Sequence, residues 1–309
     1  MSQSAIPKAS PPGNVNSRGA SRSLTVTALG EQHRSEVLQF LDQRPAHTFG
    51  LSSFILSNGL VSPHNRGDFH ACRDREGKLM GVALIGRFIL FETQSSNHKD
   101  VDKEVIRAFA RVARPYDDGH MLLGEEDKVR TFWRYYAQGK MKPRLHSRQL
   151  LLEHRWPIEL HQPVPALRPA TLSELDLVAP AHAELAFAES GINPLEVDAE
   201  AFRQRCARRI EQGKTIVLIE NGRLIFKAEI VGDTPGTVYL EGVWVNPDER
   251  RKGNGLRCVS ELTRTLLCRT ASVSVLVNEK YEAARALYTR VGFRLSSYYS
   301  TVFLQREPR

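Results

Sequence analysis

Residues 239–256 read Tyr239-Leu-Glu-Gly-Val-Trp-Val-Asn-Pro-Asp-Glu-Arg-Arg-Lys-Gly-Asn-Gly-Leu256, and this stretch decides the fold. The run from Val238 to Val245 is rich in β-forming side chains and predicts a buried strand. Asn246-Pro247 ends that strand, because proline lacks an N–H and restricts the residue before it. Apolar side chains recur at helical spacing from Leu256 onward. The stretch therefore predicts a strand, a loop and a helix in that order.

The loop has the spacing Arg-x-x-Gly-x-Gly, from Arg250 to Gly255. A loop that leads into a helix directs backbone N–H groups and the positive end of the helix dipole toward one point, which suits an anionic phosphate. The two glycines permit close approach because they lack a Cβ, and Arg251 and Lys252 add positive charge. The same residues are compatible with an ordinary basic turn before an amphipathic helix. The preceding strand and the following helix favour the phosphate-binding interpretation.

This loop differs from two common phosphate-binding motifs. A P-loop requires Gly-x-x-x-x-Gly-Lys-Ser/Thr, and a dinucleotide-binding loop requires a third glycine where this chain has Cys258. The pattern resembles the acetyl-CoA loop of the GNAT (Gcn5-related N-acetyltransferase) superfamily, which is Gln/Arg-x-x-Gly-x-Gly/Ala after a strand that ends Val-x-Pro. The resemblance runs from Val245-Asn-Pro247 through Gly255.

A second segment nearer the C-terminus has the same resemblance. Asn278, then Tyr288 on a predicted helix, then Gly292-Phe293 are similar to the corresponding GNAT segment, with one additional residue between the asparagine and the helix. The resemblance implies an α+β fold for residues 164–309. This is the acyl-CoA N-acyltransferase fold, a mixed, mostly antiparallel central sheet flanked by helices.

Residues 24–157 are predicted to have elements in a similar order, β-α-β-β-α-β-α-β, which indicates a tandem of two such domains. The N-terminal copy has no Arg-x-x-Gly-x-Gly after its long strand, and Ser95–Asp100 stands there instead. We therefore expect a GNAT-like N-terminal domain without a CoA loop. Residues 1–23 are rich in Ser, Pro, Gly and Ala, and they predict a disordered tail.

Three further predictions concern single elements. The apolar run 79–91 predicts one strand, and residues 148–152 predict another. Residues 172–177 and 179–189 predict two short helices separated near Pro180.

The expected reaction is attack of an amine on the acetyl thioester of acetyl-CoA. An alkyl ammonium with a pKa of about 10.4 loses a proton before it attacks. By the resemblance, Glu241 on the Val238–Val245 strand is the candidate base, and Tyr288 is the candidate acid for the leaving thiolate. Each residue also has a purely structural interpretation, Glu241 as a surface carboxylate and Tyr288 as a buried helix tyrosine.

The cosubstrate-binding residues also follow from the resemblance. Gly242 inside a strand indicates a bulge or a close backbone approach. In GNAT proteins this strand diverges from the next one and its backbone contacts the pantetheine arm. The predicted acetyl-CoA contacts are Val243, Trp244, Val245, Arg250, Arg251, Lys252, Gly253, Asn254, Gly255, Leu256, Asn278 and Ala284.

Composition and residue spacing narrow the classes of function and of binding site that remain possible. The four cysteines show no Cys-x-x-Cys spacing, and the ten histidines show no ligand spacing, so we expect reduced thiols in a cytoplasmic protein and no metal. The net charge of +8 permits nucleic-acid binding, but no aromatic stacking motif supports it, and we expect no nucleic-acid partner. No stretch approaches the roughly 20 apolar residues of a membrane span.

Two functions from different classes remain. The first is an N-acetyltransferase whose acceptor is a primary amine of a small molecule or a protein, with a homodimer as a possible assembly. The alternative is a non-catalytic CoA-binding regulatory protein, which keeps the loop but lacks proton transfer.

Overall fold

The computed structural model describes residues 24–94, 99–137, 141–159 and 162–306. The predicted tail, residues 1–23, lies outside the described residues, as do residues 95–98 of the segment expected to replace a CoA loop.

The strands form one sheet of twelve in the order β1-β2-β3-β4-β5-β12-β6-β11-β10-β9-β8-β7. Neighbours are antiparallel except for two parallel pairs, β4 with β5 and β10 with β11. The first six strands are β1 (Thr25–Ala28), β2 (Gly67–Arg73), β3 (Leu79–Gly86), β4 (Phe88–Thr93), β5 (Met121–Glu125) and β6 (Met141–His154). The last six are β7 (Arg168–Pro169), β8 (Thr215–Glu220), β9 (Arg223–Asp233), β10 (Val238–Val245), β11 (Val273–Asn278) and β12 (Arg294–Arg306).

This strand order contains the same motif twice, which confirms the predicted tandem of two α+β units. In the first half, β1 to β4 are antiparallel neighbours, and β5 then joins β4 in parallel. In the second half, β7 to β10 and then β11 repeat that arrangement. The fold class expected from the resemblance is therefore the one observed.

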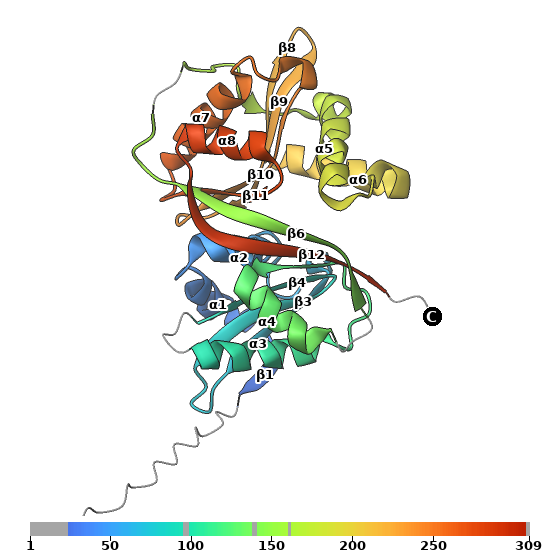
Figure 1. Ribbon diagram of the computed structural model, residues 1–309, viewed down its shortest axis with the longest axis vertical. Helices are drawn as coiled ribbons and strands as arrows, with labels where there is room; N and C mark the ends of the chain where they lie inside the picture. Colours follow the sequence, from blue (N-terminus) through green and yellow to red (C-terminus); the bar gives the residue numbers. More distant parts are fainter. Residues whose placement is uncertain (1–23, 95–98, 138–140, 160–161, 307–309) are drawn as a thin grey trace, which may run out of the picture.

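The final strand of each half is exchanged with the other half. β12 ends the second half but pairs with β5 of the first, and β6 ends the first half but pairs with β11 of the second. β6 and β12 also pair with each other along almost their whole lengths. Figure 1 shows these two long strands crossing the middle of the molecule between the two halves. The exchange makes one continuous sheet.

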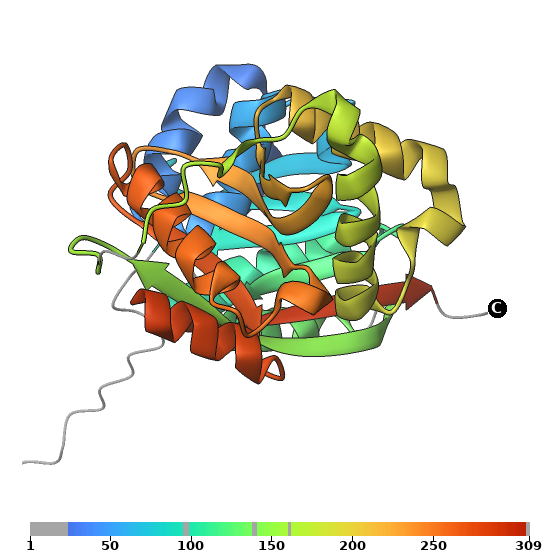
Figure 2. The ribbon, with the colours of Figure 1, turned by 90° about the horizontal axis from the view of Figure 1, so that it is seen from above.

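Helices cover both faces of each half (Figures 1 and 2). The first half has α1 (Arg34–Leu41), α2 (Pro45–Asn58), α3 (Lys99–Ala113) and α4 (Glu126–Tyr136). The second half has α5 (Leu175–Ser190), α6 (Pro194–Glu211), α7 (Asn254–Leu267) and α8 (Glu282–Val291). Buried side chains of α7 and α8 join those of β9, β10 and β11 in one hydrophobic cluster, while α5 packs with Trp244 in another. The end of β10 thus lies between two helical layers. No helix in the described part of the chain is long and apolar enough to cross a bilayer.

Several element predictions need correction. The run 79–91 is two antiparallel strands, β3 and β4, which turn at Arg87. An uninterrupted apolar run gives no sign of where a fully buried hairpin reverses. α2 was not predicted, because its buried side chains are spread around the helix rather than gathered on one face.

Two other elements are longer than predicted. β6 covers fourteen residues rather than 148–152, because it crosses both halves of the sheet. α5 continues through Pro180, where a break was expected. Pro180 is the sixth residue of this helix, so the helix lacks one backbone hydrogen bond there and still continues to Ser190.

Candidate active site

The central feature of the second half is a gap between β10 and β11. These parallel strands pair only where Val238, Tyr239 and Leu240 face residues 273–275. Beyond Leu240 no pair joins β10 to β11, although β10 continues to Val245. The backbone of the second part of β10 is therefore free to contact a ligand on that side.

The other edge of β10 contains a bulge opposite β9. Glu241 pairs with Glu229 and Trp244 pairs with Lys227, so Gly242 and Val243 lie between the two pairs without partners. Gly242 has a φ of +58°, in the left-handed region that glycine tolerates best. The sequence-based expectation of a bulge at Gly242 is confirmed.

The loop after β10 ends in an uncapped helix. α7 begins at Asn254 with Gly253 as its N-cap, at a φ of +86°, and no side chain caps it. The first-turn N–H groups of a helix have no intrahelical acceptor, so they are available to an anion in front of the helix. A Cβ added to Gly255 would lie 3.3 Å from Val245 Cγ2 and 3.5 Å from Leu287 Cδ2. β10, α7 and α8 therefore meet at this glycine.

The three cations of the loop are arranged differently from one another. Arg250 folds back, since its Nε donates to the Val245 carbonyl at 3.1 Å and its guanidinium lies 3.5 Å from Glu184. Lys252 pairs with Glu249 at 3.1 Å, and Asn254 Nδ2 donates to the same carboxylate at 3.4 Å.

Arg251 is exposed at a φ of +63°. Of the three cations, only Arg251 has no recorded ion pair within the described ranges. We therefore expect it to be the most readily available to a phosphate.

The remaining predicted contacts fall into two groups. Val243, Val245, Leu256 and Ala284 are half-buried and pack against the cluster shared by β10, β11, α7 and α8. Two other side chains face elsewhere. Trp244 is buried against α5, with its Nε1 donating to Glu184 at 2.9 Å. The Asn278 side chain accepts from the N–H of Lys280 at 3.1 Å within its own turn.

Electrostatic effects on Tyr288 and Glu189 link three ionisable side chains of the second half. Tyr288 is buried and packs edge-on against Phe293. Burial, followed by the nearby charge of Glu189, raises the pKa of Tyr288 above its usual value. Glu189, near the end of α5, has its pKa raised to about 7 by the surrounding protein and then by the Glu241 carboxylate. Glu189, Glu241 and Tyr288 thus come from α5, β10 and α8 into one electrostatic neighbourhood.

Sequence reasoning did not identify Glu189, because residues 179–189 contain no motif. It also missed a buried charged cluster made by Lys227 and Glu229 on β9 and His182 on α5. A signal for the cluster was present, since Leu224-Ile-Phe-Lys-Ala-Glu-Ile230 places two charges in an otherwise apolar strand. Buried Lys and Glu are rare unless they are paired.

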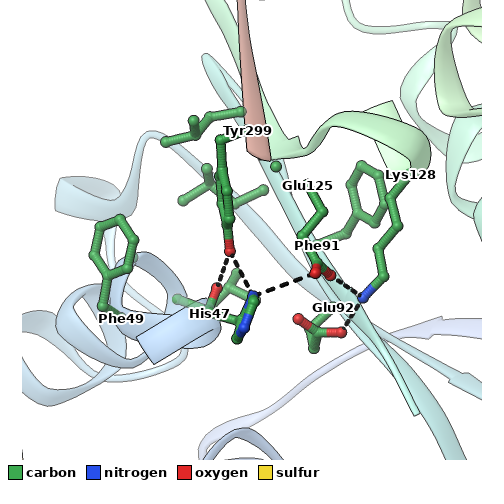
Figure 3. A pocket seen from close by; sticks show the side chains of 12 residues that line it. His47, Phe49, Phe91, Glu92, Glu125, Lys128 and Tyr299 are labelled. Carbon is green, nitrogen blue, oxygen red and sulfur yellow. Dashed lines mark hydrogen bonds and ion pairs between the residues drawn. The ribbon is translucent and has the colours of Figure 1, made fainter. Parts of the chain in front are cut away.

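The first half has a corresponding gap, and charged and aromatic side chains line a pocket there (Figure 3). β4 and β5 pair only at Phe88, Ile89 and Leu90, which matches the three pairs of β10 and β11. Beyond them Arg44 reaches Glu92 at 3.0 Å and Glu125 at 2.8 Å, and Lys128 contacts both carboxylates.

This ion network sets the charge states around the pocket. Although burial raises it, the hydrogen bond from Arg44 and the charge of Lys128 lower the pKa of Glu125 to about 2. Burial and then the Arg44 charge lower the pKa of His47 to about 4, so His47 is neutral at pH 7. Tyr299 of the exchanged strand β12 lies 3.1 Å from His47 Nδ1.

Comparisons with known proteins agree with this architecture. The structure is similar to an acetyltransferase from the GNAT family of Colwellia psychrerythraea, with a TM-score of 0.53, 12% identity, and coverage of 91% of this chain and 100% of that one. A tandem GNAT protein from the clavulanic acid biosynthesis pathway gives a TM-score of 0.55, 11% identity, and coverage of 93% and 100%.

Sequence comparison points to the same superfamily. The model of the FR47-like protein family matches residues 227–302. The UPF0039 protein C11D3.02c of Schizosaccharomyces pombe is 32% identical over 109 residues, which are 33% of this chain and 73% of that protein. The second half of the chain contains an FR47-like domain, which is related to the GNAT superfamily. The FR47-like match spans the bulge, the loop and α8, so the features that resemble GNAT proteins lie in the second half of the tandem. Across the described ranges, no group of three or more His, Cys, Asp or Glu side chains is placed to hold a metal ion.

Proposed function

We propose that this GNAT protein is an acetyl-CoA-dependent N-acetyltransferase whose acceptor is a primary amine. The observation that carries the proposal is the gap beyond Leu240, bordered on one side by the Gly242 bulge and at its end by the uncapped start of α7. An acyl thioester carrier has an extended arm and a diphosphate. The free backbone of β10 suits the arm, and the N–H groups of α7 suit the diphosphate.

The reaction requires no covalent enzyme intermediate. The amine nitrogen donates its lone pair to the thioester carbon, the C–N bond forms, and the C–S bond breaks as the electron pair leaves on sulfur. One proton leaves the nitrogen, and one is delivered to the thiolate. Positioning of the amine against the carbonyl supplies most of the rate enhancement, since oriented reactants have high effective concentrations.

The proton-transfer roles are assigned to three side chains. Glu241, on the β10 side of the gap, is the candidate base, and its neighbour Glu189 is a second candidate because a pKa near 7 suits proton uptake at neutral pH. Tyr288 is the candidate acid, because a neutral phenol can protonate a thiolate.

The deciding measurement is titration with acetyl-CoA by calorimetry, followed by a screen of an amine library for release of free thiol. We expect saturable binding and acceptor-dependent thiol release. Absence of saturable binding would refute the proposal.

Two variants separate the enzyme from a CoA-binding regulatory protein. Tyr288→Phe and Glu241→Gln are each expected to lower kcat about 100-fold and to leave the Kd for acetyl-CoA within about threefold. A regulatory protein would bind acetyl-CoA but release no thiol with any amine, in the wild type as in the variants.

A further inference from the structure

The Lys227 side chain on β9 is wholly buried beneath the β10 bulge, with an exposure of 0%. Its Nζ lies 2.9 Å from Glu229 Oε1, 3.1 Å from His182 Nδ1 and 3.3 Å from the Gly242 carbonyl oxygen. Three acceptors match the three N–H groups of an ammonium. The Lys227 ammonium is thus fully hydrogen-bonded, and one of its bonds goes to the backbone of the bulge itself.

Each side-chain partner of Lys227 is suited to accept a hydrogen bond from it. Burial, then the charges of Lys227 and Arg209, hold the pKa of His182 well below its ordinary value, so its ring is neutral and Nδ1 accepts. The Glu229 side chain is 2% exposed, and the Thr215 hydroxyl donates to it at 3.2 Å. Arg209 lies 3.7 Å from the same carboxylate.

The bond from Lys227 to Gly242 fixes the direction of the next amide. The Gly242–Val243 peptide is trans, so its C=O and N–H groups point in opposite directions. Because the carbonyl is directed at Lys227, the Val243 N–H is directed away from it. The positive charge behind the carbonyl also polarises the peptide group and makes that N–H a stronger donor.

The first half has the corresponding strands but neither the buried lysine nor the bulge. Counting outward from the three matched parallel pairs, the position on β3 that corresponds to Lys227 is Gly81. Gly81 pairs with Thr93 in an unbroken β3–β4 register, so β4 has no bulge there. The buried lysine and the bulge therefore occur together in the second half and are both missing from the corresponding strands of the first.

Stability alone is a weak reason for this arrangement. Replacing a buried ion pair by well-packed apolar side chains is often neutral or stabilising. The cluster also encloses a position that requires glycine, since an added Cβ at Gly242 would lie 3.2 Å from Lys227 Nζ while φ is in the left-handed region.

We propose that Lys227 is a positioning residue for acyl transfer. It acts through the Gly242–Val243 peptide, whose N–H it aims and polarises toward the thioester carbonyl oxygen, where negative charge develops as the amine attacks. This inference rests on the proposed acetyltransferase function. Lys227 itself does not touch the substrate, and Glu229 and His182 hold it in place.

The test replaces the buried pair as a unit, because removing Lys227 alone would leave the Glu229 charge buried without its closest partner. The variant is Lys227→Met with Glu229→Gln. The matched control is Lys128→Met with Glu92→Gln, which makes the same exchange in the buried network of the first half. The readouts are kcat, the Kd for acetyl-CoA, the melting temperature and the infrared carbonyl band of bound ¹³C-labelled acetyl-CoA.

For the Lys227 variant we expect kcat to fall about tenfold or more, since loss of a whole donor of this type costs roughly 100-fold or more. The Kd is expected to stay within about threefold, because the effect belongs to the transition state. The bound carbonyl band should lie at higher frequency than in the wild type. The control should keep the wild-type kcat and carbonyl band, whatever its melting temperature.

Three outcomes would overturn the inference: an unchanged kcat and carbonyl band in the Lys227 variant, an equal loss of kcat in the control, or a fall in kcat that follows only the melting temperature. Should the double variant not fold, Lys227→Arg and His182→Gln in the full chain provide the same infrared comparison. If the wild type neither binds acetyl-CoA nor releases thiol, the proposed function fails instead, and the two failures are thereby distinguished.

Discussion

Glu189 is a carboxylic acid whose pKa is raised by its surroundings in the second half. It lies near the end of α5, opposite Glu241, and its pKa is raised to about 7 by the surrounding protein and then by the Glu241 charge. A carboxyl group whose folded-state pKa lies above its unfolded value binds protons preferentially in the folded state. Its contribution to stability is present below about pH 4.5 and is lost as the pH rises through about 7.

We therefore predict that Glu189→Gln stabilises the protein more at pH 8 than at pH 4.5. The side chain remains in contact with solvent, so the shift in melting temperature should be small and screened by salt. Differential scanning fluorimetry at both pH values measures it. Glu211→Gln, at the exposed end of α6, removes a carboxylate outside the site and provides the control. An equal shift at both pH values for Glu189→Gln would contradict the raised pKa.

At the start of α7 the backbone, rather than any side chain, supplies the proposed ligand contacts. Gly253 is the uncapped N-cap at a φ of +86°, and an added Cβ would meet no atom within 4 Å. Gly213, after α6, has the same properties at a φ of +66°. Gly253 lies at the proposed diphosphate site, whereas Gly213 lies far from that site in the sequence. Gly213 therefore serves as the matched control.

Gly253→Ala and Gly213→Ala are each expected to lower stability by about 1 kcal/mol, the cost of a side chain in the left-handed region. Only Gly253→Ala is expected to weaken acetyl-CoA binding as well. The expected factor is about tenfold, which corresponds to ~1.4 kcal/mol of lost hydrogen bonding to a charged group. Chemical denaturation and isothermal titration calorimetry measure the two effects. Similar Kd values for both variants would argue against a diphosphate in front of α7.

The exchange of β6 and β12 binds the two halves into one folding unit. β12 pairs with β5 and β6, and β6 pairs with β11, so removing either half leaves long unpaired strand edges. An exposed strand edge with an apolar face promotes aggregation. Neither half should therefore be a stable domain in isolation, although each has its own helical layers.

Residues 164–309 expressed alone are expected to aggregate or to lack a cooperative thermal transition. Co-expression with residues 24–157 should restore a soluble one-to-one complex, because the exchanged strands can pair between two chains as they do within one. Size-exclusion chromatography and circular dichroism provide the readout. A monomeric, cooperatively folded 164–309 segment would show that the exchange is dispensable.

The sequence alone determined the elements that depend on local spacing. The periodic apolar positions of α7 and α8, the proline after β10 and the glycine inside it specify the strand, bulge, loop and helix. Each depends on hydrogen bonds and side-chain faces within a few residues of one another. The Asn221-Gly222 turn between β8 and β9 is equally local, because Asn-Gly favours the positive φ values that a tight hairpin turn requires. Both residues have a positive φ in the structure. The tandem of two units was predicted because a similar order of elements occurs twice along the sequence.

Only the tertiary structure decided which distant segments meet. The exchange of β6 and β12 cannot be predicted from local spacing, because packing selects strand partners that are more than a hundred residues apart in the sequence. Arg250 turns back to β10, Glu189 arrives from α5, and Lys227 meets Gly242 from a neighbouring strand. Lys227 shows the strongest effect of burial, because an ion removed from water needs the nearest available counter-charge or carbonyl. The local geometry of the loop was therefore readable in the chain, whereas the electrostatics of the site arose from the fold.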